Sequence, residues 1–214
     1  MDPDGREVII KGDDVDGAVQ QLQNQTNLKL SYDKNGNLSY SGKMKTPIDQ
    51  MITDAIDNPD ITVNMIANKS NSFDGIFTTE IGGGYFGNIY DDGKVNTYQL
   101  VSTSLLAAFD FSVGGEKSGL TMVHELAESF YGGQIALETK KGSPPSTFNG
   151  TTYEQAHYKA NQIAIGNRGR LYLRLHTTNA YTFGKPGKST IYSDGPFSTC
   201  FQIGWIRATD ERGM

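Results

Sequence analysis

The sequence predicts an α+β fold, in which an N-terminal β-α-β-β-α-β layer precedes a sheet with two helices and C-terminal antiparallel strands. Two observations carry this prediction. In the first 70 residues, short segments of alternating apolar residues are interleaved with two segments of helical spacing. The composition, with 25 glycines and 11 tyrosines among 214 residues, is typical of a turn-rich protein with substantial strand content.

The first stretch, residues 1–70, is predicted to form a compact α/β module without a catalytic constellation. Asn35-Gly36 is a strong signal for a hairpin turn. Pro47, directly after Thr46, favours the first position of a helix. The expected elements, in order, are a strand at Glu7–Lys11, a helix capped by Asp13 or Asp14, strands at Leu28–Tyr32 and Leu38–Tyr40, a helix from Pro47 that Asn58-Pro59 ends, and a strand at Ile61–Ile66.

The second stretch, residues 71–214, is predicted to form the larger domain. The glycine run Gly82–Gly84 lacks the lysine of a phosphate-binding loop, so we expect a turn or bulge beside a strand. The expected elements are strands at Gly75–Glu80 and Val95–Val101, a helix from near Ser118, a helix from Tyr153 to about Ile165, and antiparallel strands within Arg170–His176 and Tyr181–Trp205.

The composition argues against several classes of protein. No apolar run approaches the roughly 20 residues that cross a bilayer, and no leader resembles a signal peptide. The net charge of −5 and the scattered lysines argue against a nucleic-acid partner, which needs clustered Lys and Arg. The single cysteine, Cys200, excludes internal disulfides and thiolate metal clusters, and we expect it to be a buried strand residue.

The first candidate site is the segment His124–Glu128, with the sequence His-Glu-Leu-Ala-Glu. In a helix, positions 124 and 128 project from the same face one turn apart. An imidazole and a carboxylate at this spacing can bind one Zn²⁺. Glu125, about 100° around the helix, lies where it can take a proton from the metal's water. We therefore expect His124 and Glu128 to be metal ligands and Glu125 to be the catalytic base.

The third ligand is expected from a second helix. His157 lies at the edge of an inward-facing helical stripe that includes Tyr153. The loop Lys140–Gly150 is longer than closure requires, and it can return the second helix so that His157 meets the other two ligands. We expect Ser143-Pro144-Pro145 to stiffen this loop, and Phe148 is the one large apolar residue with which it could dock. The result is a site with two His and one carboxylate.

Several nearby residues have more than one interpretation. Glu154 fits a capping box with Thr151, in which its carboxylate reaches back to the helix start, but it could also join the metal. His176 alternates with apolar residues in an expected strand, where it needs no catalytic role. Three tyrosines flank the site and could stabilise an oxyanion, namely Tyr131, Tyr153 and Tyr158.

The two helical segments together resemble the zincin metallopeptidases, in particular variants that occur as toxin domains of bacterial polymorphic proteins. The resemblance covers about 40 residues, Leu120 to Ala160, and departs from the usual motif at Glu128, where a second His is expected. It implies a zincin-like fold around the site, a bound Zn²⁺, and a peptide or protein substrate.

A second resemblance lies in the first residues. Asp2-Pro3-Asp4-Gly5-Arg6 is similar to the Asp-Pro-x-Gly segment that ends the core of Rhs-repeat proteins, although the same residues also make a good type I turn. The resemblance implies that residues 1–6 close an Rhs core and that the chain is the C-terminal effector domain of a larger bacterial protein. It further implies export without a signal peptide of its own, action outside the producing cell or inside a target cell, and a cognate immunity protein as partner.

These observations predict a zinc-dependent, peptidase-like hydrolase, and two alternatives stay open. The first is a metal-dependent hydrolase of cell-wall amides or phosphodiesters. The second is a non-catalytic binding or delivery module with a structural or absent metal, in which Glu128 could pair with a surface lysine. A structural site fills all four positions with protein ligands, so Glu154 or His176 as a fourth ligand would favour the binding module.

Overall fold

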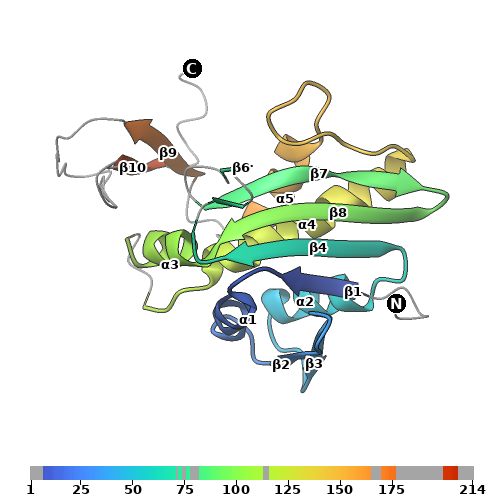
Figure 1. The fold of residues 1–214 in the computed structure, drawn as a ribbon, viewed down its shortest axis with the longest axis horizontal. Helices are drawn as coiled ribbons and strands as arrows, with labels where there is room; N and C mark the ends of the chain where they lie inside the picture. Colours follow the sequence, from blue (N-terminus) through green and yellow to red (C-terminus); the bar gives the residue numbers. More distant parts are fainter. Residues whose placement is uncertain are drawn as a thin grey trace.

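The computed structural model of the chain describes residues 7–70, 72–73, 76–77, 82–112, 116–164, 170–176 and 200–206. Its main sheet has the strand order β1-β4-β8-β7 (Figure 1). β1 and β8 run parallel to β4, whereas β7 pairs antiparallel with β8 at the edge. The bounds of these strands are Glu7–Lys11 for β1, Ile61–Asn68 for β4, Gly83–Asp91 for β7 and Lys94–Ser102 for β8. The stretches before and after residue 70 therefore contribute to one sheet.

The N-terminal β-α-β-β-α-β order is confirmed. Between β1 and β4 lie α1 (Val15–Gln23), β2 (Lys29–Tyr32), β3 (Leu38–Ser41) and α2 (Pro47–Asp57). β2 and β3 form the expected antiparallel hairpin, and Gly36 has a φ of 88° in its turn, where a side chain would be strained. Pro47 is the first residue of α2, as predicted, and Thr46 is its N-cap.

The main sheet buries one face against a helix. Along β4, alternate residues from Ile61 to Ala67 are buried, and the residues between them are half-buried. In β8, Thr97 and Gln99 lie opposite Val63 and Met65 and share this buried face. The helix α4 (Leu120–Thr139) covers it and contacts β4, β8 and β7 (Figure 1). A sheet with helices on one face is the α+β arrangement that the sequence predicted.

The helix α4 lies at the centre of the fold. It contacts α1, α2, α3 and α5 as well as the sheet, and most of its residues are buried. α5 (Tyr153–Ala164) packs along it, and both helices begin and end close to the predicted positions. Because α4 is buried on nearly all sides, its polar residues must find partners inside the protein.

One helix, α3 (Thr103–Ser112), was not predicted. It follows β8 without any intervening turn residue, and its apolar residues do not form a single helical stripe, so the sequence carries no start signal for it. Asp110 of α3 is buried and accepts hydrogen bonds from the backbone N–H of Gly119 and of Thr121. α3 therefore provides an acidic group for the beginning of α4, where backbone N–H groups lack helical partners.

The remaining described strands form two-stranded antiparallel sheets. β9 (Arg170–His176) and β10 (Cys200–Ile206) pair antiparallel, as predicted for the C-terminal stretch, and Cys200 does lie in a strand. β5 (Ser72–Phe73) pairs with β6 (Ile76–Phe77), whereas most of the expected strand Gly75–Glu80 lies outside the described residues. So do residues 1–6 and 181–199. Of the described helices, none is long and apolar enough to cross a membrane.

Near the start of α2, the carboxylate of Asp49 is fully buried and accepts several hydrogen bonds. Its donors are the backbone N–H groups of Asn27, Lys45 and Thr46, the side-chain amide of Asn27 and the hydroxyl of Thr26. Burial alone would raise the pKa of Asp49, but these hydrogen bonds outweigh it and hold the pKa well below its ordinary value. The ionised carboxylate therefore ties the α1–β2 connection to α2.

We expect Asp49→Asn to lower the free energy of unfolding by roughly 2–4 kcal/mol at pH 7, because an amide presents N–H groups to donors. The folded-state pKa of Asp49 is lowered, so its contribution is complete above the unfolded-state value of about 4 and is lost as the pH falls below it. The difference in the free energy of unfolding between parent and variant, measured with urea, should therefore begin to shrink below about pH 4 and keep shrinking as the pH is lowered further. Asp54→Asn, on the exposed side of the same helix, is the matched control. If the difference in the free energy of unfolding between the parent and Asp49→Asn does not change with pH, the charge of Asp49 does not have this role.

Candidate metal centre

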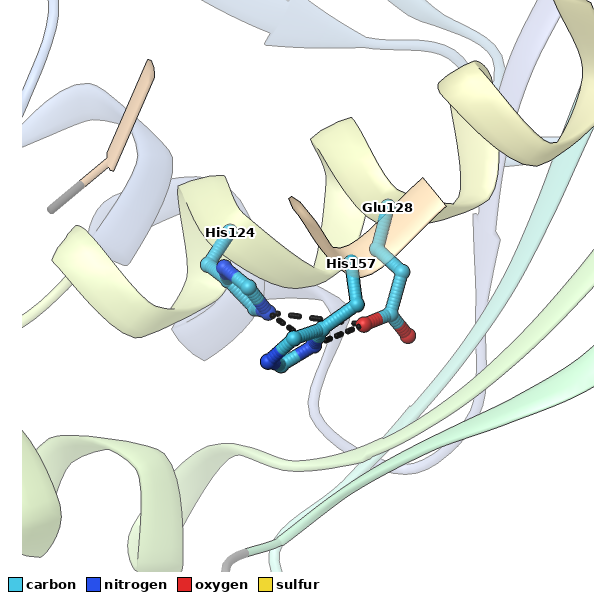
Figure 2. Close-up of side chains that lie close together, drawn as sticks. All are labelled: His124, Glu128 and His157. Atoms are coloured by element: carbon cyan, nitrogen blue, oxygen red, sulfur yellow. Dashed lines mark hydrogen bonds and ion pairs between the residues drawn. The ribbon is translucent and has the colours of Figure 1, made fainter. Parts of the chain in front are cut away.

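The three expected ligands lie together in the structure. His124 and Glu128 extend from α4 one turn apart, and His157 reaches them from α5 (Figure 2). The Nδ1 atom of His157 lies 2.7 Å from Oε2 of Glu128 and 3.2 Å from Nε2 of His124. The distance between Nε2 of His124 and Oε2 of Glu128 is 3.4 Å. Two imidazole nitrogens and one carboxylate oxygen thus converge, and this cluster could hold a metal ion.

These distances can be compared with those around a metal ion. When a tetrahedral Zn²⁺ has bonds of about 2.05 Å, its donor atoms lie about 3.3 Å from one another. The distances of 3.2 and 3.4 Å that involve His124 match this value, whereas the 2.7 Å between His157 and Glu128 is that of a hydrogen bond. Nδ1 of His157 carries either one proton or one lone pair, so it cannot form a good hydrogen bond with both Glu128 and His124. A cation between the three atoms would satisfy all of them.

The electrostatics of Glu128 fit a ligand. Its side chain is almost completely buried, and burial alone would raise the pKa of its carboxyl. The contacts from His124 and His157 outweigh this effect and lower the pKa below the ordinary value. Glu128 is therefore ionised, as a metal-binding carboxylate must be.

Glu125 lies beside this cluster but does not belong to it. It is buried, and its Oε2 accepts a hydrogen bond from the side-chain amide of Gln99 on β8. Burial, and then the negative charge of Glu128, raise the pKa of Glu125 above its ordinary value, and the charge of His124 acts in the opposite direction. The carboxylate is thus near enough to both His124 and Glu128 for their charges to act on it.

The secondary candidates have different surroundings. The Tyr153 ring lies 5.1 Å from the His157 ring, centroid to centroid. Burial, and then the charges of Glu128 and Glu125, raise the pKa of its phenol, which keeps it a proton donor. Tyr131 packs against Phe130 and Lys159, whereas Tyr158 is exposed.

Glu154 is exposed and is not part of the cluster. Instead of a capping box with Glu154, the hydroxyl of Thr151 accepts a hydrogen bond from the backbone N–H of Tyr153. The side chain of His176 lies outside the described residues. Within the described part of the chain, no fourth protein ligand joins the three.

Access to the cluster is from the side of His157. Its side chain is 34% exposed, whereas those of His124 and Glu128 are 6% and 3% exposed. Nδ1 of His124 is buried and has no hydrogen-bond partner in the described part of the structure. Tight packing, and not the usual outer hydrogen bond, therefore orients this imidazole.

The loop between the ligand helices is anchored to the sheet. The backbone N–H and C=O of Ser143 pair with those of Asn88 on β7, at 3.1 and 2.9 Å. The Ser143 hydroxyl accepts a hydrogen bond of 2.9 Å from the N–H of Thr152, directly before α5. Phe148, the expected apolar anchor, is instead 61% exposed. Ser143 thus connects β7 to the start of the helix that carries His157.

We expect deletion of Ser143–Thr147, with Thr151–Ala160 intact, to weaken zinc binding about 10–100-fold, as changes around metal ligands do. The reason is geometric, because α5 loses its link to β7 while all three ligands remain. Competition with a chromogenic chelator measures the affinity. Phe148→Ser, in the same loop but exposed, is the control and should bind zinc as the parent does. Unchanged affinity in the deletion variant would show that packing against α4 alone positions His157.

Two residues near the site were not found by the sequence analysis. Gln99 comes from β8 and Gly83 from the start of β7, which begins inside the glycine run where a turn or bulge was expected. The register irregularity of β7 lies further on, between Tyr85 and Asn88. Both residues are far from α4 in the sequence, and no local pattern links them to it.

Comparisons of the chain with protein-family models, with curated proteins and with solved structures give no match. The resemblances to zincins and to Rhs-repeat proteins therefore stay predictions.

Proposed function

We propose that this chain is a zinc-dependent hydrolase that cleaves peptide bonds. The observation that carries the proposal is the convergence of ligand atoms from His124, Glu128 and His157, with a further buried carboxylate, Glu125, beside them. Two His and one carboxylate form the ligand set of several zinc peptidases, and they leave one coordination position open. Zn²⁺ bound there would polarise a substrate carbonyl and make a coordinated water more acidic.

The protein's own groups would move the protons. Glu125 would accept a proton from the attacking water and deliver it to the leaving amine. Tyr153, whose ring lies next to that of His157, would donate a hydrogen bond to the oxyanion that develops on the substrate carbonyl. Substrate would approach past His157, because this ligand is the most exposed of the three.

The proposal extends to a biological role through the sequence resemblances. The segment Leu120–Ala160 resembles the zincin helices, and Asp2–Arg6 resembles the end of an Rhs core. The role that they support is that of an effector domain, which acts on peptides or proteins of a target cell and is restrained by an immunity protein.

Mass spectrometry of a defined peptide pool tests the activity. The zinc-loaded protein should generate new peptide termini, 1,10-phenanthroline should stop the reaction, and added zinc should restore it. A phosphodiester substrate and a cell-wall amide substrate are incubated with the protein in parallel. Hydrolysis of one of these, with intact peptides, would replace the proposal with the hydrolase of non-peptide substrates. No hydrolysis of any substrate by fully zinc-loaded protein would favour the binding module.

A further inference from the structure

A buried glutamine connects the two carboxylates of α4. Gln99 lies on β8, is fully buried, and directs its amide nitrogen towards α4. Nε2 donates a hydrogen bond to Oε2 of Glu125 and lies 3.4 Å from Oε1 of Glu128. One amide has two N–H groups, so a single side chain can serve both carboxylates. Its carbonyl oxygen has no partner in the described part of the chain, so contact with the carboxylates is the polar interaction that this side chain makes there.

The contact with Gln99 distinguishes the two oxygens of Glu128. Oε1 faces the amide, whereas Oε2 is the atom that lies 2.7 Å from His157 and 3.4 Å from His124. A carboxylate arranged in this way offers one oxygen to a cation between the ligands. The other oxygen is held towards β8.

Gly83 on β7 has no side chain, so the carboxylate of Glu125 can lie directly against the backbone of β7. A Cβ atom at this position would lie 2.1 Å from Cδ of Glu125 and 2.2 Å from each of its carboxylate oxygens. The backbone of β7 therefore touches the carboxylate, and only glycine leaves room for it. The start of β7 and Gln99 of β8 together confine Glu125 against the sheet.

We infer that Gln99 and Gly83 form a carboxylate clamp, which prevents Glu125 and one oxygen of Glu128 from coordinating the metal while Glu125 stays beside the ligands. The inference rests on the proposed function and deepens it. The Glu125 carboxylate, or the second oxygen of Glu128, could otherwise fill the remaining position of the three-ligand site, and a site filled by protein ligands is structural, not catalytic. The clamp leaves the open position to water or substrate. Gln99 and Gly83 are thus positioning residues for Glu125 and Glu128.

Cobalt spectroscopy of the full chain tests the clamp without reference to any substrate. Co²⁺ replaces Zn²⁺ in such sites, and its visible absorption reports the coordination number and the binding of azide at an open position. The Co²⁺-loaded parent should respond to azide. Gln99→Leu removes the amide, and Gly83→Ala pushes the Glu125 carboxylate out of its place. We expect either change to alter the cobalt spectrum and to weaken azide binding at least 10-fold.

Thr97→Val is the matched control. Thr97 lies two residues from Gln99 on the same strand, is equally buried, and contacts α4 through the Ser129 hydroxyl at 2.7 Å. Loss of the Thr97 hydroxyl should lower the stability of the protein but leave the cobalt spectrum and the azide response unchanged. If Gln99→Leu does not fold, Gly83→Ala decides the question, because it removes no polar group.

The outcomes separate the clamp from the metal centre. A parent that binds Co²⁺ and azide, with the same spectrum and azide affinity in both clamp variants, would overturn the clamp and leave the zinc proposal intact. A parent that takes up no Co²⁺ would overturn both. An equal loss of azide binding in Thr97→Val would show a general effect of core substitutions and would also overturn the clamp.

Discussion

Replacement of Glu125 by glutamine is expected to lower the rate of peptide hydrolysis by about 10²–10⁴-fold, the usual contribution of a general acid–base group. Glutamine has the size of glutamate, and its carbonyl oxygen can still accept the hydrogen bond from Gln99. It cannot accept a proton from water. Zinc content and thermal stability should therefore remain close to those of the parent, while the catalytic rate constant falls.

The control for this substitution is Glu154→Gln, the same chemical change at an exposed position of α5. Initial rates on one cleaved peptide, measured with the zinc content of each sample, provide the comparison. Equal rates for Glu125→Gln and the parent would show that Glu125 has a structural role. The binding-module alternative would then become the better account of the site.

Local spacing predicted the part of the site that a single helix builds. His124 and Glu128 are four residues apart, and a helix puts such residues on one face whatever surrounds it. His157 required one tertiary step, the return of α5 onto α4, and the inward-facing stripe of α5 indicated that step. The N-terminal elements were predictable for a similar reason, because Pro47 and the Asn35-Gly36 pair mark helix start and hairpin turn locally.

The rest of the site depends on strand register and loop docking. Gln99 faces Glu125 because β8 pairs in parallel with β4, which brings alternate β8 residues under α4. No pattern within β8 distinguishes Gln99 from a solvent-facing residue, and its role appears only with the sheet assembled. The role of Ser143 is equally hidden in the sequence. Its backbone pairs with Asn88, which is far away along the chain, and its hydroxyl binds Thr152, which lies beyond a turn. Non-local contacts of this kind leave no periodic signal.

The substitution of both histidines should have the largest effect on metal binding. His124→Ala with His157→Ala removes two of the three donors and leaves the buried Glu128 without its partners. Changes outside a ligand set already cost about 10–100-fold in affinity, so the loss here should exceed about 100-fold. A buried, unpaired carboxylate is also destabilising, so His157→Gln, at the exposed side of the cluster, is prepared as the milder variant.

Zinc content is the most direct test of the central claim, that His124, Glu128 and His157 form a metal centre. Plasma emission on dialysed protein should give about one zinc per chain for the parent, as a single site with three ligands requires. The His124→Ala, His157→Ala variant should contain almost none, and His157→Gln should lose zinc at chelator concentrations that the parent withstands. A doubly substituted protein that is folded and retains the zinc content of the parent would contradict the site.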